Sequence, residues 1–294
     1  FDFYKPDLLL VLGDRYEIFS AAVSAMVCCV PIAHIHGGET TFGCIDESFR
    51  HGITKMSQYH FVAAEEYKKR VIQLGEHPQR VFNVGGLGID NIKKLNLLTK
   101  DQLQKCINFK FGLKNLLVTF HPVTLEENSS QKQIENILAA LKEFPDINLI
   151  FTMSNSDTNN RIINELVKQF CISRTNAYYF NSLGQLNYLS CLKYCDGVLG
   201  NSSSGLIEVP TFNKGTINIG DRQAGRLRAK SVIDCGNSKD EIIKAINILY
   251  SDNFLKNLKN VKNPYGNGGA SNLIVNTLEK LNFKNAIKKK FFDL

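Results

Sequence analysis

A chain of 294 residues is long enough to form two ordinary domains. Its 44% hydrophobic and 21% charged residues are typical of a globular protein, and no apolar run approaches the ~20 residues that span a bilayer. The net charge of +7 is modest and no nucleic-acid-binding module accompanies it, so we expect neither membrane insertion nor a nucleic-acid partner.

The eight cysteines include no CxxC pair, so the spacing of a cysteine metal site is absent and we expect no metal or cofactor. Cys28 with Cys29, and Cys191 with Cys195, fall in helical stretches and are predicted to be buried, reduced thiols of a cytoplasmic protein. The first residues resemble no signal peptide and lack a methionine. We therefore expect the chain to begin inside a longer protein.

Short apolar runs alternate with longer helical patterns along the whole chain. The predicted strands are 8–12, 32–36, 59–63, 81–84, 116–120, 149–153, 178–180, 198–199, 215–219 and 231–234. The predicted helices are 18–27, 47–56, 65–74, 132–144, 160–170, 183–192, 206–212, 241–250 and 272–281. Apolar strands separated by helices indicate parallel sheets covered on both faces, and therefore an α/β fold.

The alternation pauses over the polar stretch 96–111, where we place a domain boundary. The expected domains are 1–98 and 99–271, with a C-terminal segment, 272–294, that packs back on the first domain. The first domain then has fewer strands than the second.

The turn Gly200-Asn201-Ser202-Ser203-Ser204-Gly205 lies between a predicted strand and a predicted helix. Backbone N–H groups, hydroxyls and a helix start at one point favour an anion site, and Glu208 is placed to accept hydrogen bonds from a ribose diol. The simpler alternative is that Asn201 and the serines only cap the helix.

Charged and amide side chains follow the carboxyl ends of the predicted strands, where ligands bind in open α/β sheets. They are Asp14, Arg15, His36, Glu39, Asp46, Glu47, Arg50, His51, His121, Asn155, Ser202, Ser203 and Arg222. The carboxylates come from the first part of the chain, and the anion turn and Arg222 come from the second. This division suits a cleft in which the second domain holds a diphosphate and the first performs acid–base chemistry.

Three common nucleotide and hydrolase motifs are missing. The sequence has no GxxxxGK[ST] loop, no GxGxxG after a strand and no GxSxG elbow. Their absence argues against an ATPase, an NAD enzyme and a serine hydrolase of the elbow type.

Six motifs, in this order, resemble the hydrolysing UDP-N-acetylglucosamine 2-epimerases of sialic acid biosynthesis. They are Gly13-Asp14-Arg15, His36-Gly37-Gly38-Glu39, the segment 46–55, His121-Pro122, the turn 200–205 with Glu208, and Gly220-Asp221-Arg222-Gln223. The non-hydrolysing relatives typically carry Gly-Asp-Thr in the first motif and lack the Gly-Gly-Glu turn. The resemblance covers nearly the whole chain.

The resemblance implies two Rossmann-like domains of the GT-B type, with the first domain truncated at its N-terminus. It also implies a homodimer or larger homo-oligomer that acts on a UDP-sugar. The implied reaction eliminates UDP to give 2-acetamidoglucal and then adds water, yielding N-acetylmannosamine. The alternatives are the same chemistry on a nucleotide-linked diacetylbacillosamine, a GT-B glycosyltransferase, or a non-catalytic nucleotide-sugar binding protein.

By the same resemblance, Asp14, His36, Asp46 and Glu47 are the candidate catalytic residues. UDP or substrate contacts are expected from Arg15, Glu39, Arg50, His51, His121, Asn155, Ser202, Ser203, Glu208 and Arg222. Neighbouring carboxylates are expected to split their pKa values into one base and one acid. Several family members have Glu where this chain has His36, so the proton role falls to His36, to Glu39 or to Glu47.

Overall fold

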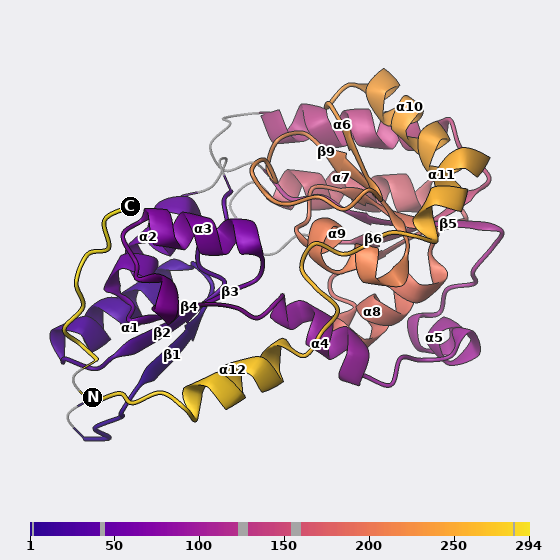
Figure 1. Ribbon diagram of the computed structural model, residues 1–294. Coiled ribbons are helices and arrows are strands. Elements are labelled where there is room, and N and C mark those ends of the chain that lie inside the picture. The colour runs from indigo at the N-terminus through magenta and orange to yellow at the C-terminus, as the bar shows by residue number, and fades with distance from the viewer. Residues whose placement is uncertain (2, 42–44, 123–128, 154–159, 285) are drawn as a thin grey trace. The chain divides into compact units, whose positions relative to one another are not determined.

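The computed structural model describes residues 1–294 except 2, 42–44, 123–128, 154–159 and 285 (Figure 1). The chain divides into two compact units, Phe1–Lys93 with Tyr265–Leu294, and Lys94–Pro264. The limits expected from the sequence, after residues 98 and 271, lie a few residues further along the chain. Within the described ranges, none of the helices combines the length and the apolar composition that crossing a membrane requires.

The first unit contains a four-stranded parallel sheet in the order β1-β2-β3-β4. Successive side chains of a strand point to opposite faces of the sheet, so alternate residues contact different helices. Ile32 packs with α1 and α2, whereas Ala33 and Ile35 pack with Ala270 and Ile274 of α12. The elements are β1 Leu9–Leu12, α1 Tyr16–Val27, β2 Ile32–Ile35, α2 Asp46–Met56, β3 Tyr59–Val62, α3 Glu65–Gln73, η1 Pro78–Arg80, β4 Val81–Asn83, α4 Leu87–Lys94 and α12 Ala270–Leu278.

The second unit contains a six-stranded parallel sheet in the order β10-β9-β8-β5-β6-β7. Its helices α6, α7 and α10 lie side by side on one face (Figure 1). The elements are α5 Lys100–Ile107, β5 Lys114–Thr119, α6 Ser129–Lys142, β6 Ile147–Thr152, α7 Asn160–Ile172, β7 Ala177–Phe180, α8 Gly184–Tyr194, β8 Gly197–Gly200, α9 Ser204–Ile207, η2 Val209–Phe212, β9 Gly215–Ile219, β10 Val232–Cys235, α10 Lys239–Leu249 and α11 Asp252–Leu258.

The order of the second sheet reverses between β5 and β8. These two strands pair in parallel although α6, β6, α7, β7 and α8 lie between them in the sequence. Such a reversal leaves an opening at the carboxyl ends of the two strands, where ligands of α/β proteins bind. His121 follows β5 closely, and Asn201 follows β8 directly. The topology therefore brings together two of the motifs that the sequence keeps 80 residues apart.

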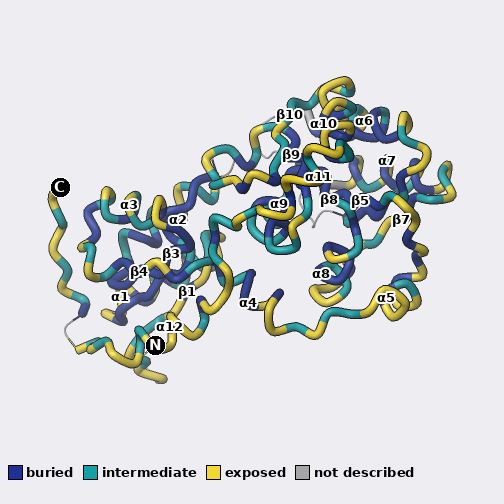
Figure 2. The backbone as a smooth tube through the Cα atoms, turned by 45° about the vertical axis from the view of Figure 1, so that its right-hand side comes forward, coloured by how far each residue is buried: buried dark blue, intermediate teal, exposed yellow. Residues whose placement is uncertain are grey.

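The α/β fold with two parallel sheets is confirmed, and every predicted strand is present with small shifts at its ends. β2, β3, β8 and β9 are buried along their whole length, as parallel strands covered on both faces should be (Figure 2). Three short helices, α4, α5 and α11, were not predicted. α5 lies inside the polar stretch 96–111 and buries only Leu103 and Ile107, so its apolar signal is weak.

The expectation that Cys28 and Cys29 are buried is wrong. α1 ends at Val27, and both thiols are exposed beyond its end. Cys191 and Cys195 are buried as predicted, because the helix that carries them packs against the second sheet. Burial raises the pKa of the Cys191 thiol to about 12.

The C-terminal segment is attached to the first unit through a buried carboxylate. Glu76 is 2% exposed and accepts hydrogen bonds from Lys55 (2.6 Å), Lys289 (2.8 Å) and His60 (3.1 Å). Phe292 donates its N–H to the carbonyl of Gly75. Burial opposes ionisation of Glu76, but the bonds from His60, Lys289 and Lys55 outweigh it and lower its pKa from 4.5 to about 2.

This cluster predicts how stability depends on pH. Because the pKa of Glu76 is lower in the folded protein than in the unfolded chain, its contribution is complete above pH 4.5 and is lost as pH falls towards 2. Glu76→Gln should lower the free energy of unfolding at pH 7 by about 3 kcal/mol and should flatten its fall over this acid range. Urea unfolding at several pH values measures both effects. The exposed Glu66→Gln is the control, and an unchanged acid dependence in Glu76→Gln would contradict the assignment.

Candidate functional site

The turn after β8 depends on a glycine that no other residue can replace. Gly200 has φ +145°, and a Cβ atom added to it would lie 1.8 Å from the carbonyl oxygen of Thr119. The missing side chain allows the ends of β5 and β8 to approach, so that Asn201 donates its N–H to the same carbonyl.

Asn201 organises the polar groups at this reversal point. Its side chain accepts a hydrogen bond from the N–H of His121 and donates one to the carbonyl of His121, both at 2.7 Å. Its own carbonyl accepts from Arg222 (3.1 Å) and from Gln223 (2.9 Å). Asn201 is 1% exposed. One buried residue therefore joins the ends of β5, β8 and β9: its side-chain amide positions His121, and its backbone carbonyl positions Arg222.

The simpler alternative, that Asn201 and the serines only cap the following helix, is wrong. Ser203 is the N-cap residue of α9, but it makes no side-chain capping bond, and the Asn201 amide is engaged with His121. α9 spans only four residues, so its dipole is small. No described residue accepts a hydrogen bond from the backbone N–H of Ser202 or Ser203. The turn therefore offers an anion two backbone N–H groups, those of Ser202 and Ser203.

Glu208 belongs to a hydrogen-bonded chain on the same turn. Tyr188 donates to the hydroxyl of Ser204 (2.7 Å), which donates in turn to Glu208. Burial raises the pKa of Glu208, although the bond from Ser204 opposes the change. The hydroxyl of Ser204 is thus used to position Glu208, and differs in this from Ser202 and Ser203.

In the first unit, the buried guanidinium of Arg50 joins the candidate carboxylates. Arg50 is 1% exposed. Its Nε and Nη2 both donate to Asp14, the former at 2.9 Å, and Nη1 donates to Glu47 at 2.6 Å. The remaining two N–H groups bind the carbonyl of Glu39 and the hydroxyl of Thr41, each at 2.8 Å. All five donors of Arg50 are therefore engaged within the unit.

Glu47 is held in its ionised form. Burial opposes ionisation, but the N–H of Thr41, the charge of Arg50 and the neighbouring His51 outweigh it and lower the pKa of Glu47. His51 lies 3.1 Å from Glu47 through its Nε2 atom. Neighbouring carboxylates were expected to split their pKa values into one acid and one base. Glu47 is not the acid of such a pair, because the cation Arg50 lies between Glu47 and Asp14.

His36 and Glu39 form a close pair on the turn after β2. The Nδ1 atom of His36 lies 2.7 Å from Glu39, and the backbone N–H of Leu87, at the start of α4, donates to its Nε2 atom at 3.3 Å. The turn between them is tight, since a Cβ atom on Gly38 would lie 2.4 Å from the carbonyl of Tyr67.

Two of the remaining predicted residues, Arg15 and Asp46, lie on the first unit. Arg15 is 64% exposed in its side chain and lies 3.5 Å from Glu17. Asp46 lies in the first turn of α2, one residue before Glu47. Asn155 lies outside the described residues. Among those described, no group of three or more His, Cys, Asp or Glu side chains could hold a metal ion.

Several residues that support this site were not predicted from their position after the strands. Asn201, Thr41 and Ser204 contact predicted site residues directly, and Gln223 contacts Asn201, yet none of the four is among the predicted site residues. His34, which is fully buried, holds the carbonyl of Gly13 at 2.8 Å and so fixes the turn before Asp14. Burial lowers the pKa of His34 to about 3, which keeps it neutral. The position of Gln223 inside a Gly-Asp-Arg-Gln motif is the one signal that could have indicated it.

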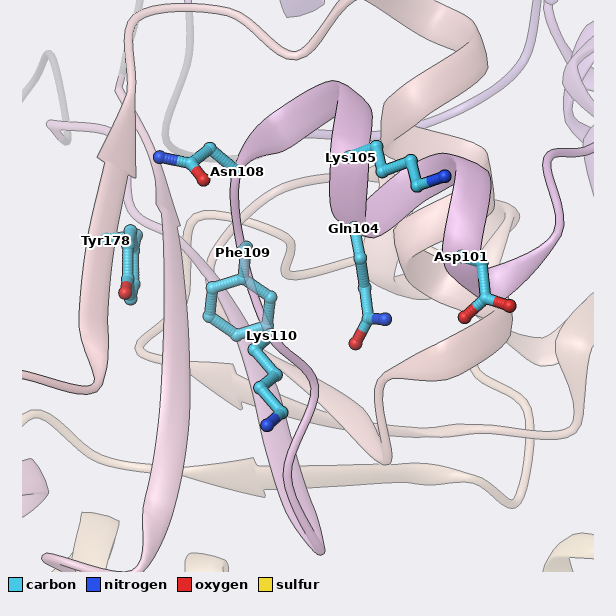
Figure 3. A pocket seen from close by; sticks show the side chains of 7 residues that line it. All are labelled: Asp101, Gln104, Lys105, Asn108, Phe109, Lys110 and Tyr178. Carbon is cyan, nitrogen blue, oxygen red and sulfur yellow. The ribbon is translucent and has the colours of Figure 1, made fainter.

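A separate pocket of about 520 Å³ lies on the surface of the second unit (Figure 3). Its apolar wall is Phe109, whose ring is 5.1 Å from that of Tyr178 on the edge strand β7. None of the predicted site residues lines it. The lining residues are Asp101, Gln104, Lys105, Asn108, Phe109, Lys110 and Tyr178.

Comparison with known proteins identifies related enzymes. The family model described as UDP-N-acetylglucosamine 2-epimerase matches residues 1–279. A Campylobacter jejuni protein named GDP/UDP-N,N'-diacetylbacillosamine 2-epimerase (hydrolyzing) is 44% identical over 100% of this chain and 77% of its own length. The Escherichia coli polysialic acid biosynthesis protein P7 is 45% identical over 98% of this chain and 74% of its own length.

The fold is also similar to that of a solved structure. The crystal structure of UDP-GlcNAc 2-epimerase from Neisseria meningitidis bound to UDP-GlcNAc superposes with a TM-score of 0.84. It covers 95% of this chain and 78% of that chain at 24% identity. At this identity the likeness concerns the fold alone.

The Arg50 network predicts a large difference between two conservative substitutions. Arg50→Lys keeps the positive charge but cannot make five fixed hydrogen bonds, so it should lower the free energy of unfolding by about 3 kcal/mol. Arg15→Lys, at an exposed ion pair, should change it by less than about 0.5 kcal/mol. Urea unfolding of the two variants checks this. Equal, small effects would show that the Arg50 contacts contribute little.

Proposed function

The chain belongs to the UDP-N-acetylglucosamine 2-epimerase family, and from this premise we propose that it is a hydrolysing 2-epimerase of an N-acetylated nucleotide sugar. The proposed reaction converts UDP-N-acetylglucosamine and water to N-acetylmannosamine and UDP, for sialic acid biosynthesis. The observation that carries it is the buried Arg50, which holds Asp14 and Glu47 together at the carboxyl end of the first sheet.

The second unit supplies the groups suited to bind the leaving group. UDP leaves C1 with its negative charge, and fixed donors around that charge lower the barrier to departure. The N–H groups of Ser202 and Ser203, which have no acceptor among the described residues, and Arg222, positioned by Asn201, are such donors. We assign the diphosphate to them and to His121, with Arg15 as a further contact. Glu208 is assigned to the ribose diol, and Asn155 to the nucleotide.

The first unit supplies the proton chemistry. Elimination removes the C2 proton as the C1–O bond breaks, which leaves a C1=C2 double bond. Water then adds its hydroxyl to C1 while C2 takes a proton on the opposite face. Asp14 and Glu47 retain 24% and 23% side-chain exposure, so their carboxylates are reachable. We assign acid–base roles to these two residues and Asp46, and a positioning role to Arg50, whose donors are already engaged.

A nucleotide-linked diacetylbacillosamine is the second candidate substrate. It is favoured by the activity for which the Campylobacter jejuni relative, at 44% identity, is named, whereas the name of the Escherichia coli relative refers to polysialic acid. The two substrates differ in their sugar, and in both the bond from C1 to a nucleoside diphosphate is broken. Incubation with each nucleotide sugar, followed by NMR of the free sugar, separates them.

The reaction class is tested in deuterated water. We expect the free sugar to carry deuterium at C2 with inverted configuration, because the C2 proton is lost and replaced from solvent on the other face. NMR of the product measures both features. Retained hydrogen at C2, or release of UDP only when an acceptor is added, would contradict the proposal and favour a glycosyltransferase.

Substitutions in the two units should affect different steps. Asp14→Asn and Glu47→Gln remove acid–base groups and should lower kcat by about 100-fold or more, with UDP affinity nearly unchanged. Arg222→Ala should instead weaken UDP binding by about tenfold or more, since it removes a charged donor. Calorimetry with UDP and steady-state kinetics give the two quantities.

Asp101→Asn, an exposed carboxylate on α5, is the matched control and should change neither. Turnover of Asp14→Asn and Glu47→Gln within a few-fold of the unsubstituted protein would rule out the assigned acid–base roles.

A further inference from the structure

Both ring nitrogens of His36 are occupied, and their partners define its tautomer. A backbone N–H can only donate, so the bond from Leu87 at 3.3 Å requires a lone pair on Nε2. The proton of the neutral imidazole then lies on Nδ1, which donates to Glu39 at 2.7 Å. The side chain of Glu39 is 4% exposed, and that of His36 is 16% exposed.

The backbone on either side of His36 is also fixed. His36 has φ +67°, an uncommon conformation for a residue with a side chain, and its N–H donates to the carbonyl of Phe61 on β3. Arg70 of α3 binds the carbonyl of Gly38, and Arg50 of α2 binds that of Glu39. The turn is therefore held by three elements of the first unit, and the imidazole adds the contact with a fourth, α4.

α4 is in turn joined to the start of α12. Asp90, one turn after Leu87, is 3% exposed and accepts hydrogen bonds from the N–H groups of Gly269 (2.6 Å), Ala270 (3.0 Å) and Ser271 (2.7 Å). These bonds satisfy the first N–H groups of α12. Hydrogen bonds on either side of the first turn of α4 thus connect Glu39 and His36 to the start of α12.

We propose that His36 is a positioning residue whose neutral imidazole ties Glu39 to the N-terminus of α4, and that it does not carry a proton in the reaction. A proton carrier needs one ring nitrogen directed at substrate or water, whereas each nitrogen of His36 has a protein partner. The proton steps then fall to Asp14, Asp46 and Glu47. This inference rests on the proposed function for its kinetic consequences, but not for the tautomer.

Amide substitutions distinguish the two roles. An Asn amide can replace Nδ1 as a donor to Glu39, and a Gln amide oxygen can replace Nε2 as an acceptor from Leu87, but neither exchanges a proton near neutral pH. His36→Asn and His36→Gln should each lose less than about tenfold in kcat, whereas His36→Ala should lose about 100-fold. UDP affinity should be unchanged in all three. Losses of about 100-fold or more in Asn, Gln and Ala variants alike would overturn the proposal.

A spectroscopic measurement tests the tautomer without turnover. In protein labelled with ¹⁵N-histidine, the ring of His36 at pH 8 should show a protonated Nδ1 and an unprotonated Nε2, and Glu39→Ala should keep Nε2 unprotonated because the N–H of Leu87 still donates to it. His36→Asn identifies the signal by its loss. A protonated Nε2 in the unsubstituted protein would overturn the inference. If the unsubstituted protein releases no free sugar, the proposed function fails, while this measurement still decides the tautomer.

Discussion

The first unit depends on one buried cation. An arginine withdrawn from water is strongly destabilising unless its charge and all its donors are satisfied. Arg50 meets this condition through Asp14, Glu47, Thr41 and the carbonyl of Glu39, which come from three separate segments. Because these groups must converge on one planar guanidinium, their mutual geometry is fixed before any ligand arrives. The same charge lowers the pKa of Glu47 and keeps it anionic.

The second unit solves a similar problem with a neutral group. The reversal of strand order between β5 and β8 leaves polar backbone groups at the end of the sheet, and the amide of Asn201 satisfies them in pairs. An amide both donates and accepts, which a carboxylate or an ammonium group cannot do. The result is a turn in which two N–H groups have no acceptor in the described part of the chain, with the positive side chain of Arg222 held beside it.

Polar residues near the site divide into those that face a ligand and those that hold other residues. The hydroxyl of Ser204 contacts Tyr188 and Glu208. His36 was a candidate catalytic residue, and both of its ring nitrogens contact protein groups. The length of α9 also determines what the turn can offer to a ligand. α9 is too short to provide a strong dipole, so the turn offers individual N–H groups. α5 escaped prediction because it buries two apolar residues and otherwise faces solvent.

The sequence by itself determined the α/β fold, the order of strands and helices, and the strand ends at which reactive residues gather. Those features follow from apolar runs and their spacing, which are local. Only the tertiary structure decided that Arg50 and Asn201 turn inward, that Cys28 and Cys29 turn outward, and which nitrogen of His36 accepts a bond. The direction of a polar side chain depends on partners distant in the chain, such as Asp14 for Arg50, 36 residues away, or His121 for Asn201, 80 residues away. Periodicity contains no information about such pairs.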